Sequence, residues 1–283
     1  MITDTKFEQK DCLLRESIDN VKKVLGDELK TITIERAALG LFFSGVKLSC
    51  GHGGLCFTPI KEIPEAVCCP SSAKSMPLSG KLAGRKAEEY LKDIFGNNIL
   101  KKTLGIATLN ALSTYCWDKI PEKDYEIIMG VDAFDEINIA PGSKTVVIGA
   151  LAPMLRKLIA GNHEFKVLEM DPSTLKPKEL EHFAPASEAP KYIPDADLVV
   201  ITGVTVLNDT LVDLLSYVKE GADVIVTGPT VSMLPDAFLK RGVTIIGGII
   251  VTKPDELLDI ISEAGSGYHF FGKFAERLII KKK

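Results

Sequence analysis

Five short apolar runs in the second half of the chain constrain its fold more than any other feature. They lie at 145–148, 165–168, 198–201, 224–226 and 243–246. Helical patterns such as Leu151–Ile159 and Thr210–Val218 separate them. Continuous apolar runs are typical of strands that are buried on both faces. We therefore predict a parallel sheet covered by helices, that is, a Rossmann-like α/β domain.

The first half of the chain has a different pattern. Amphipathic spacing predicts an opening helix from Phe7 to Leu29, and apolar residues around glycines predict a small β-meander between 31 and 60. The stretch 59–77 is rich in proline and serine, which predicts a loop. Ser79 and Asn98 can each cap a further helix. The first half is therefore predicted to be a small α+β unit.

The length of 283 residues suits two domains. Pro141 and Gly142 mark a turn at the end of the segment 130–142, where the two patterns meet. We therefore predict an α+β domain at 1–135 and a Rossmann-like domain at 136–283.

Charge and apolar patterning exclude several classes of protein. Lys and Arg number 34 against 38 Asp and Glu, a net charge of -4, so no general electropositive field would collect nucleic acid. The apolar stretches are shorter than the roughly 18 residues that cross a bilayer, and the start of the chain is polar and acidic, unlike an export signal. We expect a cytoplasmic protein that binds neither nucleic acid nor membrane. Its six cysteines are then expected to be thiols without structural disulfides.

Ligands of parallel sheets bind beyond the carboxyl ends of the strands, so the residues after each apolar run are candidate site residues. Gly149 permits a tight turn after the first run. Glu169 follows the second run, about where Rossmann proteins bind ribose hydroxyls, although a solvated acid or turn residue before Pro172 is the more common case. The further glycines of a G-x-G-x-x-G motif are missing after Gly149, so close approach to a pyrophosphate is not encoded.

The third and fourth runs are followed by small and polar residues that suit hydrogen bonds to a polar ligand. The candidates are Thr202, Gly203, Thr205, Asn208, Gly228, Pro229 and Thr230. Two simpler explanations stay open: Asn208 caps the following helix, and Thr230 is an ordinary turn residue.

Two residues of the first half are further candidates for ligand binding. Asn110 lies on an apolar helix face, where an amide must be hydrogen-bonded, either to a ligand or to a neighbouring loop. Lys81 offers positive charge to an anionic ligand, although a solvated surface charge is the more common case.

The segment Cys50-Gly-His52-Gly-Gly-Leu-Cys56 is the candidate metal site, because thiolates and imidazole bind Zn²⁺ and softer metals. The pair Cys68-Cys69 lies farther along. The spacing matches no standard zinc finger, and a glycine turn with incidental thiols is the alternative.

Taken together, several motifs resemble a two-domain family described as heavy-metal chelation proteins. They are Thr202-Gly203-x-Thr205-x-x-Asn208-x-Thr210, Gly228-Pro229-Thr230 with Pro235 and Gly242-Val243, Ser79-Gly80-Lys81, and Leu104-Gly105-Ile106-Ala107-x-x-Asn110-Ala111. The resemblance covers nearly the whole chain. It implies an enolase-N-terminal-like domain followed by a Rossmann-like domain. It also implies an interdomain cleft similar to methyltransferase-like sites, with condensation or hydrolysis of pterin-, flavin- or siderophore-like molecules. The Cys50 segment departs from the family pattern.

The leading hypothesis is a protein that binds a small polar, heterocyclic or metal-chelating molecule between two domains and catalyses its condensation or hydrolysis. One alternative is a non-catalytic binding protein for a heavy metal or metal chelate. The other is a transferase that uses S-adenosylmethionine. A metal ion or a nucleoside-containing cofactor is accordingly the expected cofactor, a small molecule is the expected partner, and a homodimer is kept as an expectation.

Overall fold

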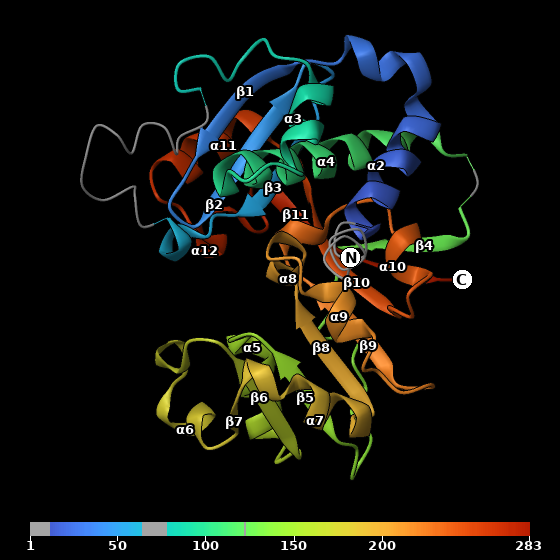
Figure 1. The fold of residues 1–283 in the computed structure, drawn as a ribbon, viewed down its shortest axis with the longest axis vertical. Helices are drawn as coiled ribbons and strands as arrows, with labels where there is room; N and C mark the ends of the chain where they lie inside the picture. Colours follow the sequence, from blue (N-terminus) through green and yellow to red (C-terminus); the bar gives the residue numbers. More distant parts are fainter. Residues whose placement is uncertain (1–11, 64–77, 122) are drawn as a thin grey trace, which may run out of the picture.

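The computed structural model describes residues 12–63, 78–121 and 123–283, which form two sheets with helices around them (Figure 1). The larger sheet has eight strands in the order β4-β11-β10-β9-β8-β5-β6-β7. Their bounds are β4 (Tyr125–Met129), β5 (Thr145–Ile148), β6 (Phe165–Glu169), β7 (Phe183–Pro185), β8 (Leu198–Thr202), β9 (Asp223–Thr227), β10 (Ile245–Val251) and β11 (Ala275–Lys282).

The predicted parallel sheet is confirmed. The strands from β10 to β7 pair in parallel, and β11 joins them antiparallel to β10. The interior of the sheet is apolar because each of the five predicted runs contributes a strand with buried residues on both faces. β4 pairs antiparallel with β11, so residues 125–129 extend the sheet that the later part of the chain builds.

The smaller sheet is the predicted antiparallel meander, with β1 (Ile34–Leu39), β2 (Phe43–Leu48) and β3 (Gly53–Phe57) in that order. Helix α4 (Ile99–Lys119) packs on it, and a Cβ atom at Gly54 of β3 would lie 2.1 Å from the carbonyl oxygen of Ala107. Glycine is therefore required where β3 meets α4.

Helix α11 (Pro254–Ser262) comes from the far end of the chain and also packs on the small sheet. A Cβ atom at Gly45 of β2 would contact Leu258 and Ile261 of this helix. Arg36 of β1 pairs with Asp255 and Asp259 at 2.8 and 2.7 Å. The first and last parts of the chain are thus joined by apolar and charged contacts.

The opening helix is α2 (Cys12–Leu25), and it ends where Gly26 takes a positive φ of 53°. The earlier residues of the predicted helix lie outside the described part. The helix predicted from Ser79 begins only at Ala87, as α3 (Ala87–Asp93), because the backbone of 84–87 bonds to residues 32 and 34 instead.

The remaining helices are short. The α-helices are α5 (Ala152–Ala160), α6 (Pro177–Leu180), α7 (Ala189–Tyr192), α8 (Val204–Leu207), α9 (Leu211–Leu215), α10 (Asp236–Leu239) and α12 (Gly267–Phe270). The 3-10 turns are η1 (Gly26–Thr31), η2 (Ile60–Glu62), η5 (Pro172–Thr174), η6 (Ala186–Glu188), η7 (Ile193–Asp195) and η8 (Pro229–Val231). None of the described helices is long and apolar enough to span a membrane.

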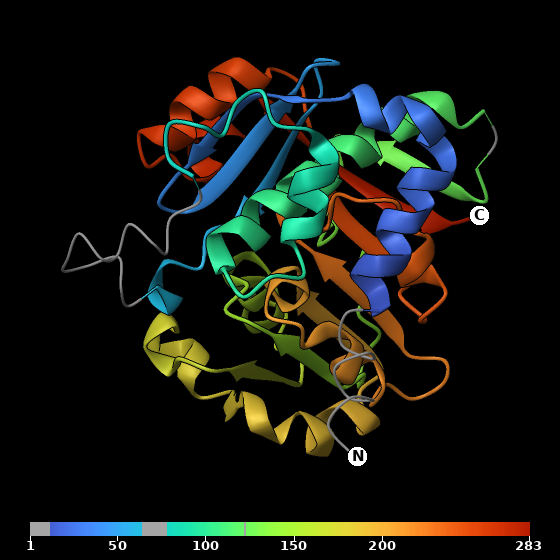
Figure 2. The ribbon, with the colours of Figure 1, turned by 45° about the horizontal axis from the view of Figure 1, so that its top comes forward.

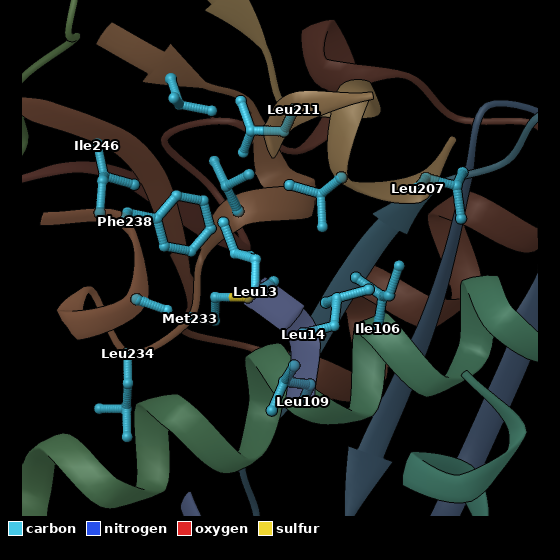
Figure 3. Close-up of a cluster of buried hydrophobic side chains, with 14 of the residues drawn as sticks. Leu13, Leu14, Ile106, Leu109, Leu207, Leu211, Met233, Leu234, Phe238 and Ile246 are labelled. Atoms are coloured by element: carbon cyan, nitrogen blue, oxygen red, sulfur yellow. The ribbon is translucent and has the colours of Figure 1, made fainter. Parts of the chain in front are cut away.

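The largest apolar core runs from one sheet to the other. Figure 3 shows Leu13 and Leu14 of α2 beside Ile106 and Leu109 of α4, with Phe238 of α10 in the same cluster. All of these side chains are buried. The core therefore holds α4 against the end of the large sheet at which the candidate residues lie.

Candidate functional site

The large sheet reverses its direction of growth between β5 and β8. From β5 the chain continues to β6 and β7 on one side, and then returns to place β8 on the other side of β5. Open parallel sheets bind ligands at the carboxyl ends of the two strands at such a switch point. Gly149 directly follows β5, and Thr202 is the last residue of β8. The candidate site therefore lies at these two residues.

Gly149 and Thr202 are in direct contact at the switch point. Gly149 has a φ of +93°, and a Cβ atom there would lie 2.8 Å from Cγ2 of Thr202. The Thr202 hydroxyl has a single weak contact among the described residues, 3.4 Å from the amide nitrogen of Val204. This hydroxyl is therefore available to a ligand, and glycine at 149 leaves room for the Thr202 methyl group.

Glu169 ties together the loops at the ends of β5 and β6. Its Oε2 accepts a hydrogen bond from the amide of Ala150 at 2.8 Å, and its Oε1 accepts from the amides of Met170 and Asp171 at 2.7 and 3.2 Å. Both carboxylate oxygens thus have backbone partners. In this arrangement Glu169 shapes the Gly149 loop. A ribose would have to share the carboxylate oxygens with these backbone amides.

An ion pair crosses from η2 of the first half to the loop after β6. Lys61 Nζ lies 2.8 Å from Asp171 Oδ2, and Figure 2 shows η2 next to this part of the large sheet. Lys61 and the hydrogen bonds from Ser173 lower the pKa of Asp171 to about 2. Lys61 therefore brings a cation to the loop after β6, near Glu169. No local sequence pattern predicts this ion pair, because its two residues are 110 positions apart.

The residues after β8 are mostly satisfied by one another. The Gly203 amide donates to the Thr227 carbonyl at 2.7 Å, and the Thr205 hydroxyl donates to the Thr202 carbonyl at 2.7 Å. Asn208 Oδ1 accepts from the Thr210 hydroxyl at 2.7 Å. These bonds fix the shape of the loop, so Thr202 is the member of this run that is best placed to face a ligand.

Asn110 connects α4 to the loop after β9. Its Nδ2 donates to the carbonyls of Leu55, Pro229 and Thr230 at 2.8, 3.1 and 3.0 Å, and the residue is 1% exposed. Thr230 Oγ1 accepts from the amide of Phe57 at 3.1 Å. We call Asn110, Pro229 and Thr230 the junction, because they hold β3, α4 and η8 together.

Gly228 links the junction to the switch point. It has a φ of +133°, and its amide donates to the Gly247 carbonyl at 2.8 Å. The sequence-predicted residues thus fall into two adjoining groups. Gly149, Glu169, Thr202, Gly203 and Gly228 lie along the carboxyl edge of the sheet, and the junction lies behind them. Lys81 is exposed in the segment before α3 and has no contact with either group among the described residues.

A partly buried ion pair between Lys102 and Asp209 was not predicted. Lys102 of α4 lies 2.5 Å from Asp209, and the Lys102 side chain is 9% exposed. Asp209 has a positive φ of 60°, which is uncommon for a residue with a side chain. Lys102 follows Lys101 near the start of α4, so no local signal showed that one of two adjacent lysines is buried.

The structure keeps Cys56 apart from Cys50 and His52. Cys56 is fully buried beside Thr230, and burial raises the pKa of its thiol to about 12. His52 Nδ1 lies 3.3 Å from the Cys50 carbonyl oxygen, and its Nε2 lies 2.9 Å from the Asp118 carboxylate. Four residues of extended chain separate His52 from Cys56 by about 13 Å. No three His, Cys, Asp or Glu side chains in the described ranges are grouped to hold a metal ion, and Cys68 and Cys69 lie outside those ranges.

His52 predicts a pH dependence of stability. Contacts with Cys50 and Asp118 raise its pKa above the ordinary 6.5, against the opposing effect of burial. A raised pKa in the folded state means that the stabilisation is complete below pH 6.5 and is lost as the pH rises through the folded-state value. Urea denaturation from about pH 6 to pH 9 should therefore show wild type losing stability relative to the His52→Gln variant. A difference that stays constant over this range would contradict the assignment.

Comparisons with known proteins place the whole arrangement in a family. Two family models match, at residues 22–113 and 132–280, and both carry the description "Putative heavy-metal chelation". An uncharacterized protein of Methanocaldococcus jannaschii is 30% identical over 193 residues, which cover 66% of this chain and 69% of that protein.

Two solved structures share the fold. A protein of unknown function from Pyrococcus horikoshii has a TM-score of 0.74 and 19% identity, covering 95% of this chain and 99% of its own. One from Desulfitobacterium hafniense has a TM-score of 0.66 and 17% identity, covering 93% and 100%. Both come from the family that the model at 132–280 describes. The chain therefore belongs to the family described as heavy-metal chelation proteins.

Proposed function

We propose that this protein binds a small metal-chelating molecule at the carboxyl edge of the large sheet, at the switch point between β5 and β8. The observation that carries the proposal is the Thr202 side chain, whose methyl group packs against Gly149 and whose hydroxyl has no strong partner of its own among the described residues. The family to which the chain belongs supports the chemistry.

The groups at this edge suit an organic chelator better than a bare soft metal ion. The edge offers the Thr202 hydroxyl, backbone groups of the glycine loops and, from η2, the Lys61 ammonium. Hydroxyl, amide and ammonium groups bind the oxygen and nitrogen atoms of an organic anion, whereas soft metals prefer thiolates. The metal would then be cargo that the chelator carries.

Catalytic condensation or hydrolysis of the bound molecule, which the family resemblance implies, is an extension of this proposal. A nucleoside cofactor such as S-adenosylmethionine is less favoured by the geometry. Its ribose would depend on Glu169, whose two oxygens already accept hydrogen bonds from three backbone amides. We therefore propose binding of the chelate first, and catalysis as a second step to be tested on the identified ligand.

The Thr202→Val variant tests the proposal. Valine keeps the shape of threonine but removes the hydroxyl, so the fold should persist while retention of the bound molecule falls by about tenfold, the effect of losing one hydrogen bond of about 1.4 kcal/mol. Retention is measured by native mass spectrometry and elemental analysis of protein purified without oxygen.

Thr145→Val is the matched control. Thr145 begins β5 at the opposite end of the sheet, and its buried hydroxyl has no hydrogen-bond partner among the described residues. The control should retain the molecule as wild type does. Equal retention by wild type and both variants would remove Thr202 from the site.

A further inference from the structure

Strand β4 leaves one side of the large sheet open. It is the end strand, and among the described residues it pairs only with β11 (Figure 1). The amide of Gly130 donates to the Arg277 carbonyl, and the amide of Lys283 donates to the Asp124 carbonyl. In an antiparallel pair the bonded residues alternate, so the even-numbered residues of β4 face β11. The backbone groups of Tyr125, Ile127 and Met129 therefore point outward.

The two ends of the sheet differ in how they are protected. At the other end, β7 has three residues and finishes at Pro185, which cannot donate a hydrogen bond. Short strands and proline are the usual protection of a sheet edge against pairing. β4 has five residues and no proline, its Met129 is 43% exposed, and Ile127 and Ile128 are only partly buried.

We infer that β4 is the surface through which a second copy of this chain binds, by antiparallel pairing of β4 with its symmetry mate. With a two-fold axis through Ile127, β4 pairs over its whole length with β4 of the second copy. This axis places Ile127 opposite the partner's Ile127 and Tyr125 opposite the partner's Met129. The outward backbone groups of each copy then meet those of the other, and the part-exposed apolar side chains become covered.

Charge selects this register over its neighbour. A shift of the axis to Glu126 would place two glutamates directly opposite each other, which is destabilising. With the axis at Ile127, Glu126 lies opposite Ile128 of the partner strand. The adjoining open groove, at the ends of β4 and β11, contains Lys123 and Lys282 as well as acidic side chains. Both signs in one patch allow two identical copies to approach without net repulsion.

Sedimentation velocity over a wide range of concentration tests the inference. Wild type should form a species of twice the 30.7 kDa protomer mass. Met129→Lys places a charge on the pairing edge at an exposed position, so the fold should persist while the dissociation constant of the dimer rises by about a hundredfold. Met170→Lys is the matched control, because Met170 is 76% exposed in the loop after β6, away from β4.

A second variant tests the register. Residues of a hydrogen-bonded pair have Cα atoms about 5.5 Å apart, within the span of a disulfide. Ile127→Cys should therefore give a cross-linked dimer on oxidation, and Glu126→Cys should give much less. A monomeric wild type would overturn the inference. So would a dimer that Met129→Lys leaves intact, or one in which Ile127→Cys forms no cross-link.

Discussion

Replacing Asn110 by alanine should lower the free energy of unfolding by about 3 kcal/mol. The side chain is buried, and its amide nitrogen is shared by three carbonyl oxygens from β3 and η8. The carbonyls of Leu55 and Thr230 would lose this partner at a place that water cannot easily reach, whereas the Pro229 carbonyl keeps the Ser232 hydroxyl at 3.0 Å. Buried acceptors without partners are more destabilising than the lost bonds alone. The loss should also loosen η8, and with it the Gly228 loop at the proposed site.

Urea denaturation of wild type and of the Asn110→Ala variant measures this effect. Asn97→Ala is the control, because Asn97 is exposed in the turn before α4 and its replacement should change the free energy by less than about 0.5 kcal/mol. If both variants unfolded at the wild-type midpoint, the junction would not hold the small sheet to η8.

Replacing Gly54 by alanine should destabilise the protein by about 3 kcal/mol or more. The added Cβ atom would lie 2.1 Å from the Ala107 carbonyl oxygen and 2.6 Å from the Ala111 amide nitrogen. Both are backbone atoms of α4, so no side chain can move aside to make room. β3 and α4 would have to separate along a contact that is buried on both sides.

Thermal unfolding compares Gly54→Ala with Gly96→Ala. Gly96 is exposed, its φ is not positive, and a Cβ atom there would meet only the Asp93 carbonyl at 3.4 Å. That control should be neutral or slightly stabilising, because alanine reduces the freedom of the unfolded chain. A wild-type Tm for Gly54→Ala would show that β3 does not pack on α4 as closely as described.

Much of the fold could be predicted from the sequence, because its main signal is local. The five apolar runs of the parallel sheet are continuous and buried on both faces, so each strand can be predicted from a few consecutive residues. β7, β4 and β11 were not predicted. β7 has three residues and contains proline, and β4 and β11 mix apolar with charged residues at the open side of the sheet. Their pairing depends on contacts between distant parts of the chain.

The candidate site, like the fold, could be predicted from the sequence only in part. Gly149 and Thr202 could be predicted because strand ends in a parallel sheet are known to bind ligands. Which of the polar residues face outward could not be predicted, since Asn110 Nδ2 donates to carbonyls of β3 and η8, and Thr230 Oγ1 accepts from an amide of β3. Lys61 reaches Asp171 only through the packing of the two sheets, so no local sequence pattern predicts this ion pair.

The proposed cargo of this protein is a metal bound to a small organic molecule at the switch point. Native mass spectrometry with elemental analysis of wild type, purified without oxygen, detects both components of this cargo. The proposal predicts a retained organic mass together with metal in the same proportion, and loss of both in Thr202→Val. A near-stoichiometric metal without an organic mass, kept in Thr202→Val and lost in Cys50→Ser, would contradict it and place function at the Cys50 segment instead.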